Sequence, residues 1–152
     1  MRSLVWLCIV ATFSAGVAAQ SQQNAPSRNT KIANRFVGAW KLVSLEELGE
    51  DGQVHKTDCE GIFVFTRDGR ASVQVMYRNG QTGSAYAQRG YEASYGSYRI
   101  DDSSTFTFHI DGALVRTLIG KDLKRAYETS GNRLIVKSTD PKEHWKVVWE
   151  RY

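Results

Sequence analysis

From Phe36 onward the sequence is built of short runs of alternating apolar and polar residues separated by turn-forming residues, and this pattern constrains the fold most. Asp68-Gly69, for example, stands between the runs Gly61–Thr66 and Ala71–Tyr77. An Asp-Gly pair between runs rich in β-branched and aromatic residues is typical of a tight β-hairpin. The pattern continues to the C-terminus without heptads or an internal repeat, which predicts about eight or nine antiparallel strands.

An open antiparallel sheet of that many strands would leave two edges exposed, and closing the sheet into a barrel removes them. The predicted fold class is therefore all-β, an antiparallel up-and-down β-barrel. A barrel of about eight strands has room for packed side chains or for one small ligand. Residues 79–90 lack strand character, and Ala85–Tyr91 fits a short helix or a loop that covers the barrel.

The N-terminal segment has the features of a secretory signal peptide. Arg2 supplies a positive charge, Leu4–Phe13 is almost wholly apolar, and small residues follow up to Ala19. The apolar run is shorter than the roughly 20 residues of a membrane-spanning helix. We therefore expect cleavage after Ala19, no stable membrane anchor afterwards, and a secreted or periplasmic protein.

The next stretch is polar and contains no apolar period, so it cannot repay its ordering entropy by burial. The predicted organisation is a signal peptide at 1–19, a flexible polar linker at 20–34 and a β-barrel domain at 35–152.

Four motifs occur in an order and spacing that resemble the bacterial and fungal lipocalin-like domain family: Gly38–Ser44, Gly61–Arg70, Tyr95–Tyr98 and Val148–Arg151. The resemblance covers Phe36 to Tyr152. It implies a small barrel around an apolar pocket, and some members of the family accompany small-molecule biosynthesis. In barrels of this type a tryptophan of the opening strand packs near a basic side chain of the closing strand, which implies a structural pair of Trp40 and Arg151.

The leading functional hypothesis is an exported lipocalin-like barrel that binds a small apolar molecule, as a monomer or homodimer. Tyr95 and Arg99 share one strand face, so together they could offer hydrogen-bond donors to a carboxylate or enolate of the ligand. Strand register decides which alternate set faces inward, and a slip of one residue exchanges the set. The candidate ligand-binding residues are Phe63, Phe65, Met76, Tyr95, Arg99, Phe106, His109, Tyr127 and Trp145.

Two alternatives remain open at this point. One is a small cofactor-free isomerase or cyclase acting on an apolar metabolite, with His109 as the candidate catalytic acid or base. The other is a structural or interaction module whose barrel is packed solid and binds no ligand. Turnover that depends on His109 would favour the first, and a side-chain-filled interior would favour the second.

Other function classes lack their sequence signatures. There is no nucleophile elbow, phosphate-binding loop or dinucleotide fingerprint, and His55, His109 and His144 lack metal-ligand spacing, so neither a cofactor nor a metal is expected. The formal net charge is +4, but 20 basic and 16 acidic residues are interspersed, which argues against a nucleic-acid partner. Cys59 lies between Asp58 and Glu60, whose charges disfavour a reactive thiolate.

Overall fold

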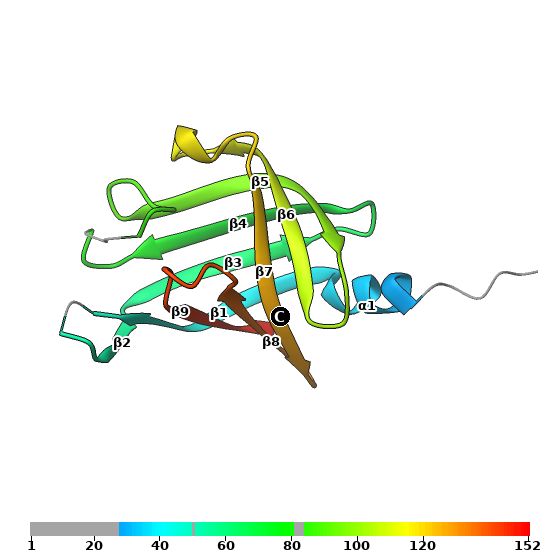
Figure 1. Ribbon diagram of the computed structural model, residues 1–152, viewed down its shortest axis with the longest axis horizontal. Coiled ribbons are helices and arrows are strands. Elements are labelled where there is room, and N and C mark those ends of the chain that lie inside the picture. The colour runs from blue at the N-terminus through cyan, green and yellow to red at the C-terminus, as the bar shows by residue number, and fades with distance from the viewer. Residues whose placement is uncertain (1–27, 50, 81–83) are drawn as a thin grey trace, which may run out of the picture.

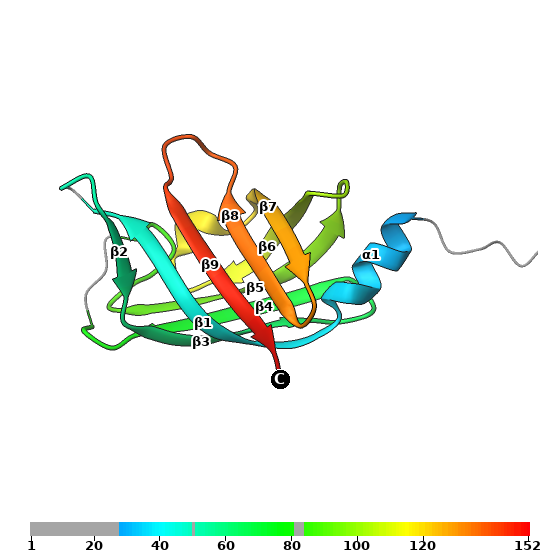
Figure 2. The same cartoon turned by 90° about the horizontal axis from the view of Figure 1, so that it is seen from below.

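A closed antiparallel barrel forms the body of the protein (Figures 1 and 2). The computed structural model describes residues 28–49, 51–80 and 84–152. Within these residues eight strands are hydrogen-bonded in a ring, β1 next to β3, then on in chain order to β9, which pairs again with β1. The all-β up-and-down barrel predicted from the alternation is confirmed.

The ring strands run from one end of the barrel to the other. Three of their connections are tight turns, including the predicted hairpin at Asp68-Gly69, and the others are longer. Gly69 has φ +81°, a conformation that glycine adopts without strain. An additional strand, β2 (Val54–Thr57), pairs with the second half of β1, and a 3₁₀ turn, η1 (Arg116–Leu118), links β6 to β7. The ring strands are β1 (Gly38–Leu48), β3 (Cys59–Phe65), β4 (Arg70–Tyr77), β5 (Tyr91–Ile100), β6 (Thr105–Ala113), β7 (Asp122–Ser130), β8 (Arg133–Ser138) and β9 (Trp145–Arg151).

A helix, α1 (Arg28–Phe36), covers one end of the barrel, which we call the closed end (Figure 2). Residues 28–34 belong to the stretch that the sequence predicted as a linker, and they are helical instead. Ile32 and Phe36 are four positions apart and so share one helix face. Ile32 is partly buried against the core and Phe36 is fully buried, so this face anchors the helix. The predicted signal peptide and residues 20–27 lie outside the described residues.

The closed end is filled by aromatic side chains. The ring of Phe36 packs edge-on against Phe65, Phe106 and Tyr127, at centroid distances of 5.2, 5.4 and 4.9 Å. The indole Nε1 of Trp40 donates a hydrogen bond to the Phe36 carbonyl at 2.7 Å. Edge-to-face pairs of this kind stabilise a core beyond the area they bury.

Trp40 and Arg151 are directly opposite each other where β9 returns to β1. The guanidinium carbon of Arg151 lies 4.4 Å from the centroid of a Trp40 ring. Its two terminal nitrogens donate to the carbonyls of Val37 and Arg35, at 2.6 and 2.5 Å. A Cβ at Gly38 would lie 2.6 Å from this guanidinium, so glycine leaves the space that Arg151 occupies.

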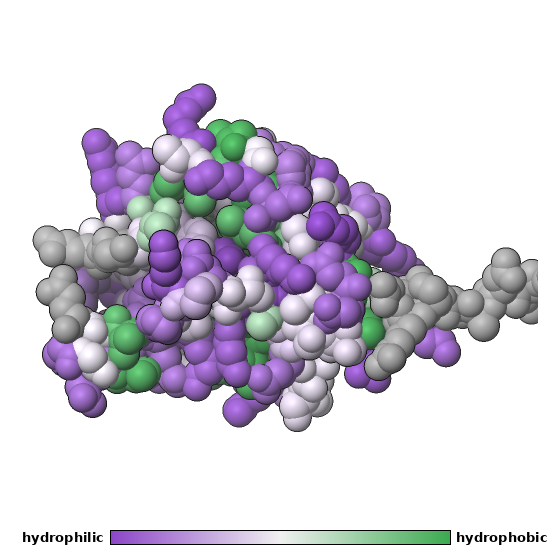
Figure 3. Space-filling view, in the orientation of Figure 1, coloured by the Kyte–Doolittle hydropathy of each residue, from purple (hydrophilic) through white to green (hydrophobic). Residues whose placement is uncertain are grey.

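The outer face seen in Figure 3 is mostly hydrophilic, with small apolar areas near η1 and β2. Leu114 and Ile119 are exposed beside η1, and Leu48 and Val54 are exposed at β2. In the described part of the chain, no helix has the length and apolar character needed to cross a bilayer.

Candidate ligand-binding site

A cavity opens at the end of the barrel opposite α1, which we call the open end. Inward-facing side chains of the ring strands form its floor, because alternate residues of a strand point into the barrel. The floor is apolar, with aliphatic and aromatic side chains: Leu42, Leu45, Phe63, Val73, Val75, Phe106, Phe108, Leu123, Val136, Val147 and Trp149.

The cavity has a volume of about 80 Å³. An engineered apolar cavity of about 150 Å³ binds benzene, and a cavity of only about 10–15 Å³ holds one water. The cavity therefore has room for the apolar part of a small ligand.

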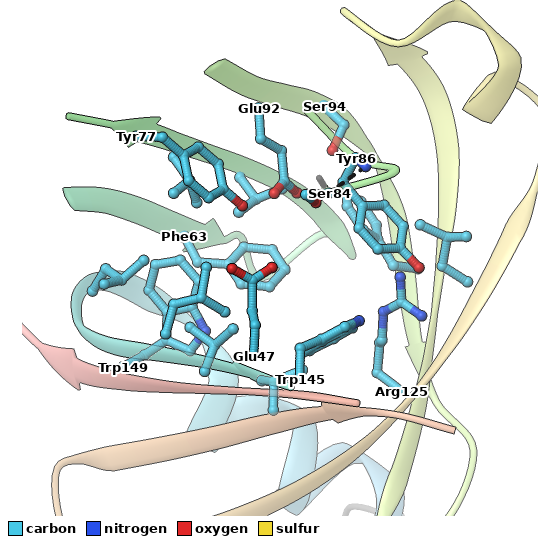
Figure 4. Close-up of a pocket in the computed structure, with 18 of the residues that line it drawn as sticks. Glu47, Phe63, Tyr77, Ser84, Tyr86, Glu92, Ser94, Arg125, Trp145 and Trp149 are labelled. Carbon is cyan, nitrogen blue, oxygen red and sulfur yellow. Dashed lines mark hydrogen bonds between the residues drawn. The ribbon is translucent and has the colours of Figure 1, made fainter. Parts of the chain in front are cut away.

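Two glutamates face the mouth from one side, Glu47 near the end of β1 and Glu92 near the start of β5. Figure 4 shows their carboxyl groups directed toward the same space, together with the Tyr77 hydroxyl. Burial raises the pKa of Glu92 to about 7; the Glu47 carboxylate also raises it, and the Arg125 charge lowers it. Glu47 accepts a hydrogen bond from Thr57 Oγ1 at 2.6 Å. At neutral pH Glu92 is therefore poised between its neutral and charged forms.

Arg125 of β7 stands on the other side of the mouth, with only 11% of its side chain exposed. Its guanidinium carbon lies 5.0 Å from the ring centroids of both Tyr86 and Trp145. A cation held between two aromatic rings is stabilised by their electron-rich faces. The nearest carboxylate is Glu143, 3.9 Å from Arg125 Nη1.

Glu143, in the loop between β8 and β9, connects several side chains on this side of the mouth. It accepts hydrogen bonds from Ser138 at 2.6 Å, from Tyr86 at 2.5 Å and from Trp145 Nε1 at 3.2 Å. Burial alone raises the pKa of Glu143, but these hydrogen bonds and the Arg125 charge together hold that pKa below its usual value. Burial raises the pKa of Tyr86 to about 12, so its hydroxyl remains a donor at neutral pH.

A bulge in β1 decides which side chains of that strand reach the cavity. Leu42 pairs with Trp149 and Ser44 pairs with Val148, so Val43 is an extra residue without its own partner on β9. Before the bulge Trp40 and Leu42 face inward, whereas after it Leu45 and Glu47 do. The bulge therefore places Glu47 in the mouth and leaves Glu46 outside, where it pairs with Lys146 at 2.7 Å.

The structure places the predicted ligand-binding residues in three groups. Phe63, Phe106 and Trp145 line the cavity. Phe65 and Tyr127 are also inside the barrel, but they belong to the aromatic cluster at the closed end and do not line the cavity. The remaining four, Met76, Tyr95, Arg99 and His109, face outward.

Strand register explains why these four residues are outside. On β4 the inward residues are Val73, Val75 and Tyr77, so Met76 points away. On β5 Ser94 and Tyr98 are buried, whereas Tyr95 is 57% exposed. Tyr95 instead covers Gly112 of β6, where an added Cβ would come within 2.5 Å of the tyrosine ring. The predicted donor pair of Tyr95 and Arg99 therefore lies on the outer surface.

His109 lies on the outer face of β6, opposite the buried Phe108 and Ile110. Its Nδ1 is 2.7 Å from Asp122 and its Nε2 is 3.6 Å from Asp111. Arg99 also forms an ion pair on this surface, with Asp101 at 3.1 Å. The candidate catalytic histidine is thus separated from the cavity by the wall of the barrel. Among the described residues, no group of three or more potential metal ligands comes together.

Sequence reasoning did not select Glu47, Glu92 or Arg125 as site residues. The sequence does contain a signal for Arg125. It is two positions from both Leu123 and Tyr127 and therefore shares their strand face, which becomes the inner face of β7. Glu92 likewise shares a face with Ser94 and Tyr98. For Glu47 strict alternation would give the wrong answer. Counting every second residue from Trp40 and Leu42 leads to Glu46, whereas the extra residue Val43 makes Glu47 face inward.

Comparisons with known proteins identify the family of this chain. The sequence profile of a lipocalin-like domain matches residues 37–152. A search of curated proteins found no match. Among solved structures, a lipocalin-like protein from Bacteroides uniformis is similar with a TM-score of 0.49 and 15% identity, over 78% of this chain and 99% of that chain.

Two further solved structures are similar at comparable levels. An uncharacterized protein from Bacteroides eggerthii has a TM-score of 0.48 and 16% identity, over 77% of this chain and 99% of that chain. A point mutant of the fluorescent protein UnaG has a TM-score of 0.41 and 11% identity, over 78% of this chain and 97% of that chain. With its profile match spanning most of its length, this chain belongs to the lipocalin-like domain family.

Proposed function

We propose that this protein is an exported binding protein that holds a small, largely apolar molecule in the open end of its barrel. The observation that carries the proposal is the cavity, which combines an apolar floor with a few polar side chains at the mouth. Small-molecule sites have this composition, because the apolar surface supplies affinity and a few polar groups fix orientation.

The contrast with the closed end supports ligand binding over a solid, non-binding module. There, Phe36, Phe65, Phe106 and Tyr127 fill the interior. At the open end the cavity wall includes partly exposed aromatic and charged groups, among them Trp145 and Glu92. Burying the apolar part of this surface beneath a ligand would be favourable, by about 25 cal/mol for each Å² of apolar area.

Tryptophan fluorescence offers a direct test, because Trp145 and Trp149 both line the cavity. The chain from residue 20 onward would be titrated with a panel of small apolar alcohols, aromatic compounds and terpenoids. We expect a saturable change in emission with some of them. A flat response across the whole panel would contradict the proposal.

A cavity-filling variant sharpens this test. Val75→Phe adds a ring to the floor and should abolish the response, whereas Val64→Phe places the same ring outside the cavity and should leave it intact. Thermal unfolding of both variants verifies that they fold. Equal binding by both folded variants would show that the ligand lies elsewhere.

The export part of the proposal rests on the N-terminal sequence. Expression of the full chain should yield a mature protein that begins at Gln20, found in the periplasm or the medium. Mass spectrometry of the fractions tests this, and an uncleaved chain confined to the cytoplasm would contradict it.

A further inference from the structure

We infer that the ligand carries a protonated amine, bound between the carboxyl groups of Glu47 and Glu92 at the cavity mouth. This inference rests on the proposed ligand-binding function and specifies the chemical class of the ligand. The groups that carry it are the charged side chains of the open end and the ways in which they are paired.

Among the described residues that line the cavity, the only cationic side chain is Arg125, and its charge is already compensated. Glu143 lies 3.9 Å from it, and the rings of Tyr86 and Trp145 flank its guanidinium group at 5.0 Å each. A stacked and partly neutralised guanidinium is a weaker anchor for a ligand anion than a free one.

The two glutamates on the other side of the mouth have no cation in close contact, and the Arg125 charge lowers the pKa of Glu92 only from beyond ion-pair distance. In the described parts of the chain, no lysine or arginine forms an ion pair with Glu47 or Glu92. Their charges repel each other, as the effect of Glu47 on the pKa of Glu92 shows. A cation placed between two carboxylates removes this repulsion and replaces it with attraction to both.

A third acidic group reports the same negative field. Cys59 of β3 is partly buried, and its thiol pKa is raised to about 11 by burial and then by the charges of Glu47, Asp58 and Glu92, which outweigh the lowering effect of the Lys56 charge. The titratable or charged groups that surround Glu92 are thus Glu47 on β1, Cys59 on β3, Tyr77 on β4, Tyr86 in the β4–β5 loop and Arg125 on β7. Arg125 alone among them favours an anion.

The geometry suits an amphipathic amine. Figure 4 shows the two carboxyl groups directed toward one space beside Phe63, and Phe63 and Trp149 both line the cavity. A primary ammonium has three N–H donors, which can be shared between the two carboxylates. Its apolar part would then descend into the cavity, whereas a ligand carboxylate in the same position would meet two like charges.

Three ligands with the same alkyl chain separate this inference from the proposed function: octylamine, octanol and octanoate. Octanol reports apolar binding alone. At about pH 8 we expect octylamine to bind best and octanoate worst, with a difference of at least about tenfold between them, because juxtaposed like charges are strongly unfavourable. Equal affinities, or tighter binding of octanoate, would overturn the inference and leave the proposed function standing. Failure of all three to bind would overturn both.

Matched variants locate the effect. Glu92→Gln and Glu47→Gln should each weaken octylamine binding by about fivefold to tenfold, since each removes one carboxylate from the pair. Octanol affinity should change little in either variant. Glu46→Gln is the control, because Glu46 is next to Glu47 but faces outward toward Lys146. An equal loss of octylamine affinity in all three variants would contradict a site at the mouth.

The pH dependence provides a readout that a purely structural role would not give. An alkylamine stays protonated between about pH 6 and pH 8, whereas the Glu92 carboxyl, with a pKa of about 7, becomes ionised over this range. Octylamine affinity should therefore rise with pH, and this rise should be absent for octanol and for Glu92→Gln. An octylamine affinity that falls across the same range would contradict the inference.

Discussion

The two ends of the barrel are built from the same strands but from different kinds of side chains. At the closed end Phe36, Phe65 and Tyr127 are buried against one another, and Arg151 is fixed by a ring and two backbone carbonyls. At the open end Glu92 is partly buried with a pKa raised to about 7, and Glu47 lies beside it. The first arrangement satisfies its polar groups and stabilises the fold, whereas the second keeps charge where a ligand can reach it.

This contrast suggests that the closed end determines stability and the open end determines ligand selectivity. Substitutions at the closed end should change the free energy of unfolding and leave ligand selectivity alone. Substitutions at the open end should change selectivity and pH dependence, with smaller or even favourable effects on stability.

The strongest test of the closed end is Phe36→Ala. It removes the ring at the centre of the aromatic cluster, and large-to-small substitutions of this type lower the stability by about 3–5 kcal/mol. Urea unfolding would measure the change. The relative affinities of octylamine and octanol for the folded variant should stay as in the parent protein. Altered selectivity would show that the closed end also influences ligand choice.

Glu92→Gln should act at the open end in the opposite direction. Because the folded-state pKa of Glu92, about 7, is above its usual 4.5, the unfolded chain loses this proton first as pH rises. The parent protein therefore loses stability between about pH 4.5 and pH 7, by on the order of 3 kcal/mol, and the loss persists above that range. The Gln variant should lack this loss. Unfolding of both proteins at pH 5 and pH 8 tests it, and parallel pH profiles would count against the burial of this carboxyl.

Arg151→Ala probes the second contact of the closed end. A cation over an indole contributes about 0.5–2 kcal/mol, so we expect stability to fall by about 1–2 kcal/mol with no change in ligand affinity. An unchanged denaturation midpoint would show that the contact with Trp40 does not stabilise this end.

Tyr86→Phe removes the hydroxyl that donates to Glu143 while keeping the ring beside Arg125. The loss of one hydrogen bond of this kind lowers stability by about 1 kcal/mol. The pKa of Glu143 should also rise, because a bond that stabilises its charged form is gone. Carboxyl titration followed by NMR would detect the shift, and an unmoved titration would contradict the role given to Tyr86.

The smallest effect is expected on the outer surface. His109→Gln alters a side chain that is 42% exposed and paired with Asp122 on the outside of β6. Stability should change by no more than about 0.5 kcal/mol, and ligand binding should not change. A clear loss of binding would mean that the outer surface of β6 takes part in the site.

The barrel could be predicted from sequence because its signals are local. Alternation on β6 separates Phe106, Phe108 and Ile110 from Thr107 and His109, and Asp68-Gly69 specifies a hairpin. Helix α1 was missed because only Ile32 and Phe36 mark its buried face, and the contact that holds them is with strands far along the chain.

The site was harder to predict because both faces of several strands carry similar residues. Tyr95 and Tyr98 are both tyrosines on β5, yet the first is outside and the second inside. Nothing in their local composition decides between them. The decision comes from the closure of the ring and from bulges, which are properties of the whole sheet.

The extra residue at Val43 has one more consequence. Removal of Val43 would leave the pairing on both sides of it unchanged, because Ser44 would then follow Leu42 in regular alternation and Glu47 would still face inward. A strand of the same length that lost the bulge would instead turn Glu46 inward and Glu47 outward. Two acids in tandem thus keep a carboxylate at the mouth whether or not the strand is bulged.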